Sequence, residues 1–128
     1  MKKILLLGYN RKQTKLLENI KNFNKNIYLK NYSSKVNFKK VKNFDLIICY
    51  GYRHKIGKEI LSKYKNKIIN LHISYLPYNK GAHPNFWSFA DNTPSGVTIH
   101  EVNEDLDSGR IIYQKKIDFE LLKNRKKT

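Results

Sequence analysis

Residues 70–77 read Asn-Leu-His-Ile-Ser-Tyr-Leu-Pro, and they follow the apolar residues Ile68 and Ile69. Residues 67–72 read as a buried strand that ends at His72, and the loop that follows, 73–84, contains two prolines and a glycine. In a strand, side chains two residues apart point to the same face, so Asn70 projects beside His72. The stretch therefore predicts a strand that delivers an amide and an imidazole into one cleft.

Similar apolar runs alternate with helical patterns on the amino-terminal side of this stretch. Strands are predicted at 3–7, 26–30, 44–50 and 67–72, and helices at 11–23 and 55–63. The first helix takes Asn10 as its N-cap and carries its apolar positions at Leu16, Leu17, Ile20 and Phe23. The polar segment 32–42 receives no assignment. Alternating strands and helices predict an α/β fold with a mostly parallel sheet and helices on both faces.

On the carboxyl side, the sequence predicts a helix at 85–90 and two further strands at 96–102 and 110–119. We expect one domain over residues 1–120 and a basic tail over 121–128, because no linker or repeat divides the chain. In parallel sheets, ligands bind beyond the carboxyl ends of the strands, which is where Asn70 and His72 fall.

Composition narrows the class of protein. Of the 128 residues, 40% are hydrophobic and 12% aromatic, which suits a folded domain rather than a disordered chain. No segment approaches the roughly 18 apolar residues of a membrane span, and the apolar run that ends at Gly8 is too short for a signal peptide. The single cysteine, Cys49, reads as a buried strand residue in a reducing compartment, so we expect a cytoplasmic protein.

The formal net charge is +16. This charge raises a nucleic-acid-binding hypothesis, but lysines are scattered along the chain and the one dense basic cluster is 123–128. A solvated basic surface is the favoured interpretation, and its summed field attracts small anionic substrates.

Several polar residues have a structural and a functional interpretation. An amide, an imidazole and a carboxylate such as Asp107 are the groups that acyl transfer needs, yet each alone is commonly a strand-end or turn residue. His54, His83 and His100 are expected to have structural or surface side chains, and a metal site from His72, His83 and His100 lacks a supporting ligand spacing.

The turn Gly8-Tyr9-Asn10 lies between a predicted strand and a predicted helix. It lacks the G-x-G-x-x-G pattern of dinucleotide-binding proteins. A substrate phosphate at the helix N-terminus and a simple strand-to-helix turn both remain open.

The order of these motifs resembles one known family. Residues 70–77, Gly81, the stretch 96–100 (Gly-Val-Thr-Ile-His) and the stretch 106–109 (Leu-Asp-Ser-Gly) together resemble the folate-dependent formyltransferases. The resemblance is densest over about 70–114. The family includes sugar N-formyltransferases, which the loop 78–88 resembles most, methionyl-tRNA formyltransferase and glycinamide ribonucleotide transformylase. It implies a Rossmann-like three-layer fold.

The resemblance also implies a mechanism. Asn70 would donate its amide N–H to the formyl oxygen, and His72 would share that stabilisation and manage protons. Asp107 would hold His72 in a useful tautomer and help remove the proton of the attacking amine. The formyl donor would be 10-formyltetrahydrofolate, and the reaction requires no metal.

Further site residues follow from the same resemblance. Two loops would bind the folate, and the acceptor would contact the end of the first strand and the loop after His72. The folate-binding residues are Tyr52, Arg53, His54, Ile56, Asn103 and Glu104, and the acceptor-binding residues are Gly8, Asn10, Ser74, Gly81 and Trp87.

The acceptor implied by this resemblance is the primary amine of a nucleotide-linked amino sugar, used in surface polysaccharide synthesis. The alternatives are methionyl-tRNA or glycinamide ribonucleotide as acceptor, and a truncated relative that binds folate or a nucleotide without turnover. Family domains usually extend well beyond the counterpart of Phe119, so we expect a fold shortened at its carboxyl end. A homodimer is also a family expectation.

Overall fold

The strands and helices alternate as the sequence predicts. The structure is a computed structural model, and it describes residues 1–72, 95–102 and 109–117. Its elements are β1 (Lys2–Gly8), α1 (Leu16–Phe23), β2 (Ile27–Tyr32), α2 (Phe38–Val41), β3 (Leu46–Tyr50), α3 (Lys58–Lys63), β4 (Ile68–His72), β5 (Ser95–Glu101) and β6 (Ile111–Ile117).

The strands of the described part form a six-stranded sheet in the order β2-β1-β3-β4-β5-β6. Strand β1 pairs in parallel with both β2 and β3, whereas β5 and β6 are antiparallel. This confirms the α/β class and the mostly parallel sheet. The chain divides into two compact units, 1–70 and 71–128, and the predicted division into a domain of 1–120 and a tail of 121–128 stays a prediction.

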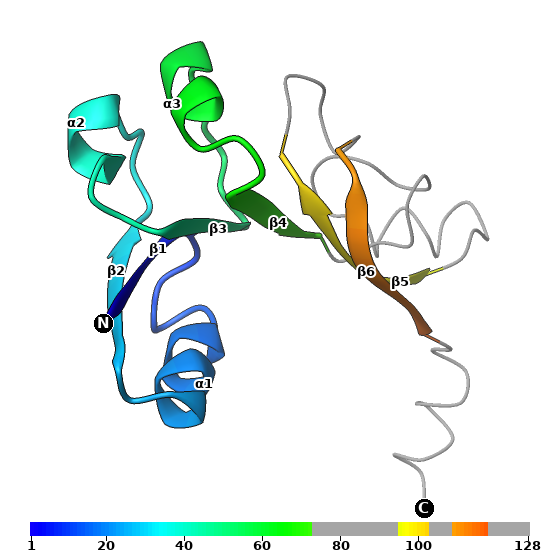
Figure 1. Cartoon of the computed structure of the whole chain (residues 1–128). Helices are drawn as coiled ribbons and strands as arrows, with labels where there is room; N and C mark the ends of the chain where they lie inside the picture. The colour runs from blue at the N-terminus through cyan, green and yellow to red at the C-terminus, as the bar shows by residue number, and fades with distance from the viewer. Residues whose placement is uncertain (73–94, 103–108, 118–128) are drawn as a thin grey trace, which may run out of the picture. The chain divides into compact units, whose positions relative to one another are not determined.

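Within the first unit, helices cover both faces of the sheet. Figure 1 shows α1 on one face and α2 and α3 on the other. Strand β1 lies between its two neighbours, and Leu5, Leu6 and Leu7 have no exposed surface. A strand that is covered on both faces needs consecutive apolar side chains, which explains the uninterrupted run that the sequence shows there. Burial of each of these leucine side chains stabilises the folded state by about 1.5–3 kcal/mol relative to an exposed side chain.

Helix α1 begins later than the sequence predicts. Asn10 is not its N-cap: the cap position is Lys15, which makes no side-chain cap bond, and the helix starts at Leu16. The residues before it form a turn in which Asn10 Oδ1 accepts from the Lys12 amide at 2.9 Å. The prediction that Phe23 lies on the apolar face is also wrong, because this last helical residue is 91% exposed.

The unassigned segment 32–42 contains the end of β2 and the short helix α2. Asn37 is the N-cap of α2, and its side-chain oxygen accepts from the Lys40 amide at 3.0 Å. The Tyr64 hydroxyl, which follows α3, donates to the Val41 carbonyl and accepts from the Phe44 amide at 3.3 Å. The buried Tyr64 therefore ties α2 and the turn after it to the end of α3.

Other boundaries agree with the predictions to within a few residues. The predicted strand 110–119 is β6 (Ile111–Ile117), and the predicted helix 55–63 is α3 (Lys58–Lys63). The predicted loop 73–84, the predicted helix 85–90 and the predicted tail lie outside the described residues. A search of the described residues finds no helix with the length and apolar character needed to cross a membrane.

Candidate active site

Strand β4 carries the two residues on which the candidate site depends. Asn70 and His72 both lie within it, two positions apart, so their side chains share one face of the strand. The His72 side chain is buried, with 7% of its surface exposed, whereas Asn70 is half-buried. The predicted strand end is thus present, with the Asn70 amide two residues before the buried His72 imidazole.

A second histidine lies against His72, and the sequence did not predict this contact. His100 of β5 is 2% exposed, and its ring centroid lies 6.4 Å from that of His72 at an interplanar angle of 70°. We expected His100 to have a structural or surface side chain, and the structure excludes the surface alternative. The available signal was the alternation in β5, which places His100 on the same buried face as Thr98.

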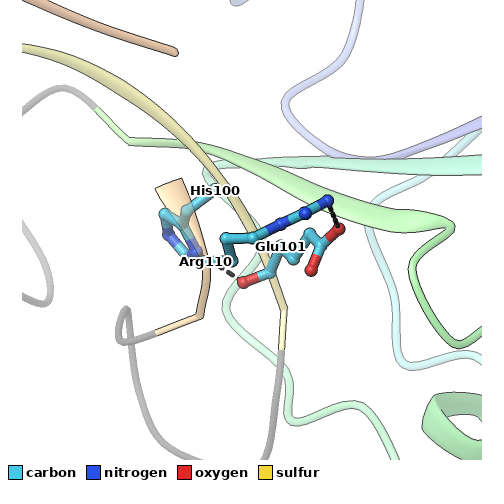
Figure 2. Close-up of polar contacts among 3 residues, drawn as sticks. All are labelled: His100, Glu101 and Arg110. Carbon is cyan, nitrogen blue, oxygen red and sulfur yellow. Dashed lines mark hydrogen bonds and ion pairs between the residues drawn. The ribbon is translucent and has the colours of Figure 1, made fainter. Parts of the chain in front are cut away.

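The backbone beside His100 is held by contacts across the β5–β6 hairpin. His100 Nδ1 lies 2.9 Å from the Glu101 carbonyl oxygen, and the Glu101 amide donates to the Arg110 carbonyl at 2.8 Å. Figure 2 shows the contact of His100 with the Glu101 carbonyl, together with the ion pair between Arg110 Nη2 and Glu101 Oε1, at 2.7 Å. Gly109 packs so closely that a Cβ there would lie 1.6 Å from the Glu101 oxygen.

The carboxyl ends of β1 and β3 meet in the first unit. Gly8 ends β1 with φ +123°, and a Cβ there would lie 1.9 Å from the Tyr50 carbonyl oxygen. The Ser33 hydroxyl donates to the Gly8 carbonyl at 2.6 Å, and Asn31 Nδ2 donates to the Tyr9 carbonyl at 3.2 Å. This predicted acceptor-binding position is therefore a rigid point where three strand ends are tied together.

Asn10 uses its polar groups within its own turn. Its amide donates to Gln13 Oε1 at 3.0 Å, and its carbonyl accepts from the Gln13 and Thr14 amides. Because Lys12 also donates to Asn10 Oδ1, these amides already have acceptors inside the turn. The geometry favours the simple turn over a phosphate at the helix N-terminus, and the roles of Gly8 and Asn10 in acceptor binding stay predictions.

The first predicted folate loop, 52–56, follows β3. Tyr52 is anchored to the neighbouring segment: its hydroxyl donates to the Ser34 carbonyl at 3.0 Å and accepts from the Val36 amide at 3.1 Å. Desolvation raises the pKa of the Tyr52 hydroxyl. The His54 ring lies edge-on to Tyr52, with centroids 5.4 Å apart.

The remaining side chains of this loop differ in exposure. Ile56 is 8% exposed and belongs to the core, while Arg53 and His54 are exposed. The loop is therefore anchored at Tyr52 and Ile56 and exposes the side chains between them, and its role in folate binding stays a prediction.

The described residues bear on two other chemistries, a cysteine nucleophile and a metal site. Cys49 is buried in β3, as the sequence predicts, and desolvation raises the pKa of its thiol to about 12, which suits a core residue rather than a nucleophile. No group of three His, Cys, Asp or Glu side chains that could hold a metal occurs in the part of the chain that the structure describes. His83, the third member of the metal site considered above, lies outside that part.

Six of the predicted site residues cannot be placed. They lie outside the described residues, so their roles stay predictions: Ser74, Gly81, Trp87, Asn103, Glu104 and Asp107.

Comparison with known proteins identifies the class. The formyl transferase family model matches residues 11–125, which include β4, β5, β6 and both predicted folate loops. The chain therefore belongs to the formyl transferase family.

Individual relatives differ in the acceptor that their names state. The crystal structure of the formyltransferase PseJ from Anoxybacillus kamchatkensis, in complex with UDP-4,6-dideoxy-4-formamido-L-AltNAc and tetrahydrofolate, matches with a TM-score of 0.80 and 46% identity over 91% of this chain and 60% of that chain. Methionyl-tRNA formyltransferase from Finegoldia magna is 41% identical over 76 residues, 59% of this chain and 24% of that protein.

A third relative carries another acceptor in its name. Phosphoribosylglycinamide formyltransferase from Bacillus subtilis is 35% identical over 99 residues, 71% of this chain and 51% of that protein. In each of these comparisons the chain spans only part of the relative's length.

Proposed function

We propose that this chain transfers a formyl group from 10-formyltetrahydrofolate to the primary amine of a nucleotide-linked amino sugar. The observation that carries the proposal is the match to PseJ, which has the highest identity of the three relatives and was solved with a formylated nucleotide sugar and tetrahydrofolate. The half-buried Asn70 and the buried His72, at the end of β4, supply the amide and imidazole that the reaction needs.

The proposed chemistry starts with attack of the amine nitrogen on the formyl carbon. Negative charge then develops on the formyl oxygen, where an N–H of the Asn70 side chain and the His72 imidazole donate hydrogen bonds. Asp107 accepts the proton of the attacking amine, directly or through a water molecule. The bond between the formyl carbon and N10 of the folate breaks, N10 takes up a proton, and tetrahydrofolate leaves.

The folate would lie along the loop that joins β3 to α3. The anchored Tyr52 and the core residue Ile56 fix the two ends of this loop, which supports recognition of a flat heterocycle by backbone groups between them. The second folate loop would contain Asn103 and Glu104, next to Asp107 in the sequence.

The charge of the chain suits an anionic acceptor. Among the first 70 residues the acidic residues are Glu18, Asp45 and Glu59 alone, while lysines and arginines are numerous. The resulting positive field raises the local concentration of a nucleoside diphosphate sugar.

The test is an acceptor panel. The protein is incubated with 10-formyltetrahydrofolate and, in turn, with UDP-linked 4-amino sugars, dTDP-linked 4-amino sugars, glycinamide ribonucleotide and methionyl-tRNA, and tetrahydrofolate release is followed. The proposal predicts turnover with a nucleotide sugar and little with the other amines. If circular dichroism shows that the protein is folded but no acceptor leads to tetrahydrofolate release, an enzymatic function is contradicted.

Methionyl-tRNA is the second candidate acceptor, because the Finegoldia magna relative is 41% identical over its aligned residues. The panel separates the two candidates directly. Tight folate or nucleotide binding in calorimetry, together with no turnover on any amine, would instead identify a binding module.

A further inference from the structure

His72 of β4 and His100 of β5 form a buried contact. The two rings meet edge to face, with centroids 6.4 Å apart and an interplanar angle of 70°. With 7% and 2% of their surfaces exposed, both are closed off from solvent, so each limits the rotamers open to the other. The His100 ring therefore restricts where the His72 imidazole can lie.

A hydrogen bond to the backbone constrains the orientation of the His100 ring. Its Nδ1 lies 2.9 Å from the Glu101 carbonyl oxygen. A carbonyl oxygen can only accept, so Nδ1 carries the proton of this hydrogen bond. The bond thus places a proton at Nδ1 and restricts the angle of the ring.

The Glu101 carbonyl is itself held in place. The Glu101 amide donates to the Arg110 carbonyl at 2.8 Å, and the Arg110 guanidinium contacts the Glu101 carboxylate at 2.7 Å, as Figure 2 shows. Gly109 lies directly against the same carbonyl oxygen, where a Cβ would be 1.6 Å away. The β5–β6 hairpin therefore supplies support for His100, in addition to the ring contact with His72 of β4.

The same buried face of the hairpin carries further polar groups. Thr98, two residues before His100 on β5, has no exposed surface, and its hydroxyl accepts from Gln114 Nε2 of β6 at 3.2 Å. An ordinary core would place apolar side chains at Thr98 and His100, because buried polar groups are costly unless they are hydrogen-bonded. The buried face of β5 that contacts His72 is therefore polar at Thr98 and His100, which favours a role in the site over a role in packing alone.

We propose that His100 is a positioning residue that holds the His72 imidazole in the orientation needed for formyl transfer. The inference rests on the proposed function for the role of His72. Arg110 holds Glu101 through its amide and its carboxylate, and Gly109 lies against the Glu101 carbonyl. This carbonyl contacts the His100 ring, and the His100 ring contacts His72. Loss of the His100 ring frees His72 to adopt rotamers that no longer reach the formyl oxygen.

The experiment compares His100→Ala and His100→Phe with the unchanged protein. His100→Phe keeps an aromatic ring but loses the Nδ1–H donor to Glu101, so it separates ring volume from ring orientation. Val41→Ala is the control for lost stability, because Val41 is fully buried on α2 and far from β4 in the sequence. Circular dichroism and thermal unfolding establish that each variant is folded.

Two readouts distinguish positioning from packing. In the formyl transfer assay, His100→Ala is expected to lower kcat by about tenfold or more, with KM for folate and acceptor changed by less than about twofold, as for a misplaced catalytic group. In nuclear magnetic resonance, the ring signals of His72 are expected to shift and broaden in both His100 variants and not in Val41→Ala. The chain has four histidines, which makes these signals assignable with a His72→Gln variant.

The outcomes separate the two proposals. A kcat within about twofold of the unchanged enzyme, or His72 signals that do not respond to His100→Ala, would overturn the positioning role even where the enzyme is active. If the unchanged protein shows no formyl transfer but the His72 signals respond, the positioning contact stands and the proposed function fails.

Discussion

At the scale of single residues, the proposed chemistry depends on Asn70 and His72 in β4. Asn70→Ala removes the amide donor to the formyl oxygen, and a donor of this kind is typically worth about 10²–10³-fold in kcat. We therefore expect Asn70→Ala to lower kcat by that amount without a comparable change in KM, measured by tetrahydrofolate release.

Asn19→Ala is the matched control for this substitution. Asn19 is an exposed asparagine on α1, and its removal is expected to leave kcat unchanged. A near-normal rate for Asn70→Ala would remove Asn70 from the proposed mechanism.

The buried thiol of Cys49 gives a prediction for pH. Desolvation raises its pKa from 9.0 to about 12, so in the folded state the thiol stays protonated while the unfolded thiol ionises. The unfolded state then binds fewer protons above about pH 9, and the free energy of unfolding falls as pH rises from there.

The measurement is urea unfolding at pH 8 and pH 10 for the unchanged protein and for Cys49→Ala. The unchanged protein is expected to lose more stability between these pH values than the variant does. An equal loss in both proteins would contradict this assignment of the thiol.

Gly8 gives a prediction for stability. Its φ of +123° and its contact with the Tyr50 carbonyl leave no room for a side chain. Gly8→Ala is expected to destabilise the protein by at least about 2 kcal/mol, from backbone strain and overpacking.

Gly57→Ala is the comparison for Gly8→Ala in urea unfolding. A Cβ at Gly57 meets nothing within 4 Å, and its cost is limited to about 1 kcal/mol as an N-cap of α3. Equal effects of the two substitutions would show that the close approach of β1 and β3 does not restrict Gly8.

At the scale of elements, the short helix α2 depends on a side chain from the end of α3. The buried Tyr64 hydroxyl donates to the Val41 carbonyl and accepts from the Phe44 amide. Tyr64→Phe removes these two hydrogen bonds but leaves the bond from the Phe44 amide to the Val41 carbonyl, at 3.2 Å. We therefore expect the free energy of unfolding to fall by about 0.5–1.5 kcal/mol in urea titration. Tyr28→Phe, at a half-exposed position on β2, is expected to change stability far less.

The elements also show what the sequence could predict. Strands β1 and β3 were identifiable because buried parallel strands are continuously apolar. The start of α1 was not, because Asn10 bonds to the Lys12 amide and forms a turn that resembles a cap in sequence. Helix α2 has four residues, too few to show a helical period, although Asn37 was a readable cap.

In the candidate site, Asn70 and His72 could be predicted from the sequence because both lie in one strand. Their spacing alone determines that their side chains share a face of that strand. His100 belongs to a different strand, and its contact with His72 depends on strand order, which a sequence does not state. The anchoring of Tyr52 by residues 34–36 is likewise a tertiary contact without a local signal.

At the scale of the whole molecule, the net charge of +16 predicts a salt-dependent reaction with an anionic acceptor. Raising ionic strength from about 0.01 M to about 0.15 M shortens the Debye length from roughly 30 Å to roughly 8 Å. We expect KM for a nucleoside diphosphate sugar to rise several-fold over this range while kcat stays nearly constant. A salt-independent KM in steady-state kinetics would contradict electrostatic attraction of the acceptor.

The most direct test of formyl transfer at β4 is the mass of the acceptor after the reaction. A UDP-linked 4-amino sugar is incubated with 10-formyltetrahydrofolate and either the unchanged protein or the double variant Asn70→Ala, His72→Ala, and the sugar is analysed by mass spectrometry. We predict that the sugar gains one formyl group with the unchanged protein and remains unmodified with the folded double variant. Formylation of the sugar at equal rates by both proteins would contradict formyl transfer at Asn70 and His72. Absence of formylation with the unchanged protein would contradict it as well.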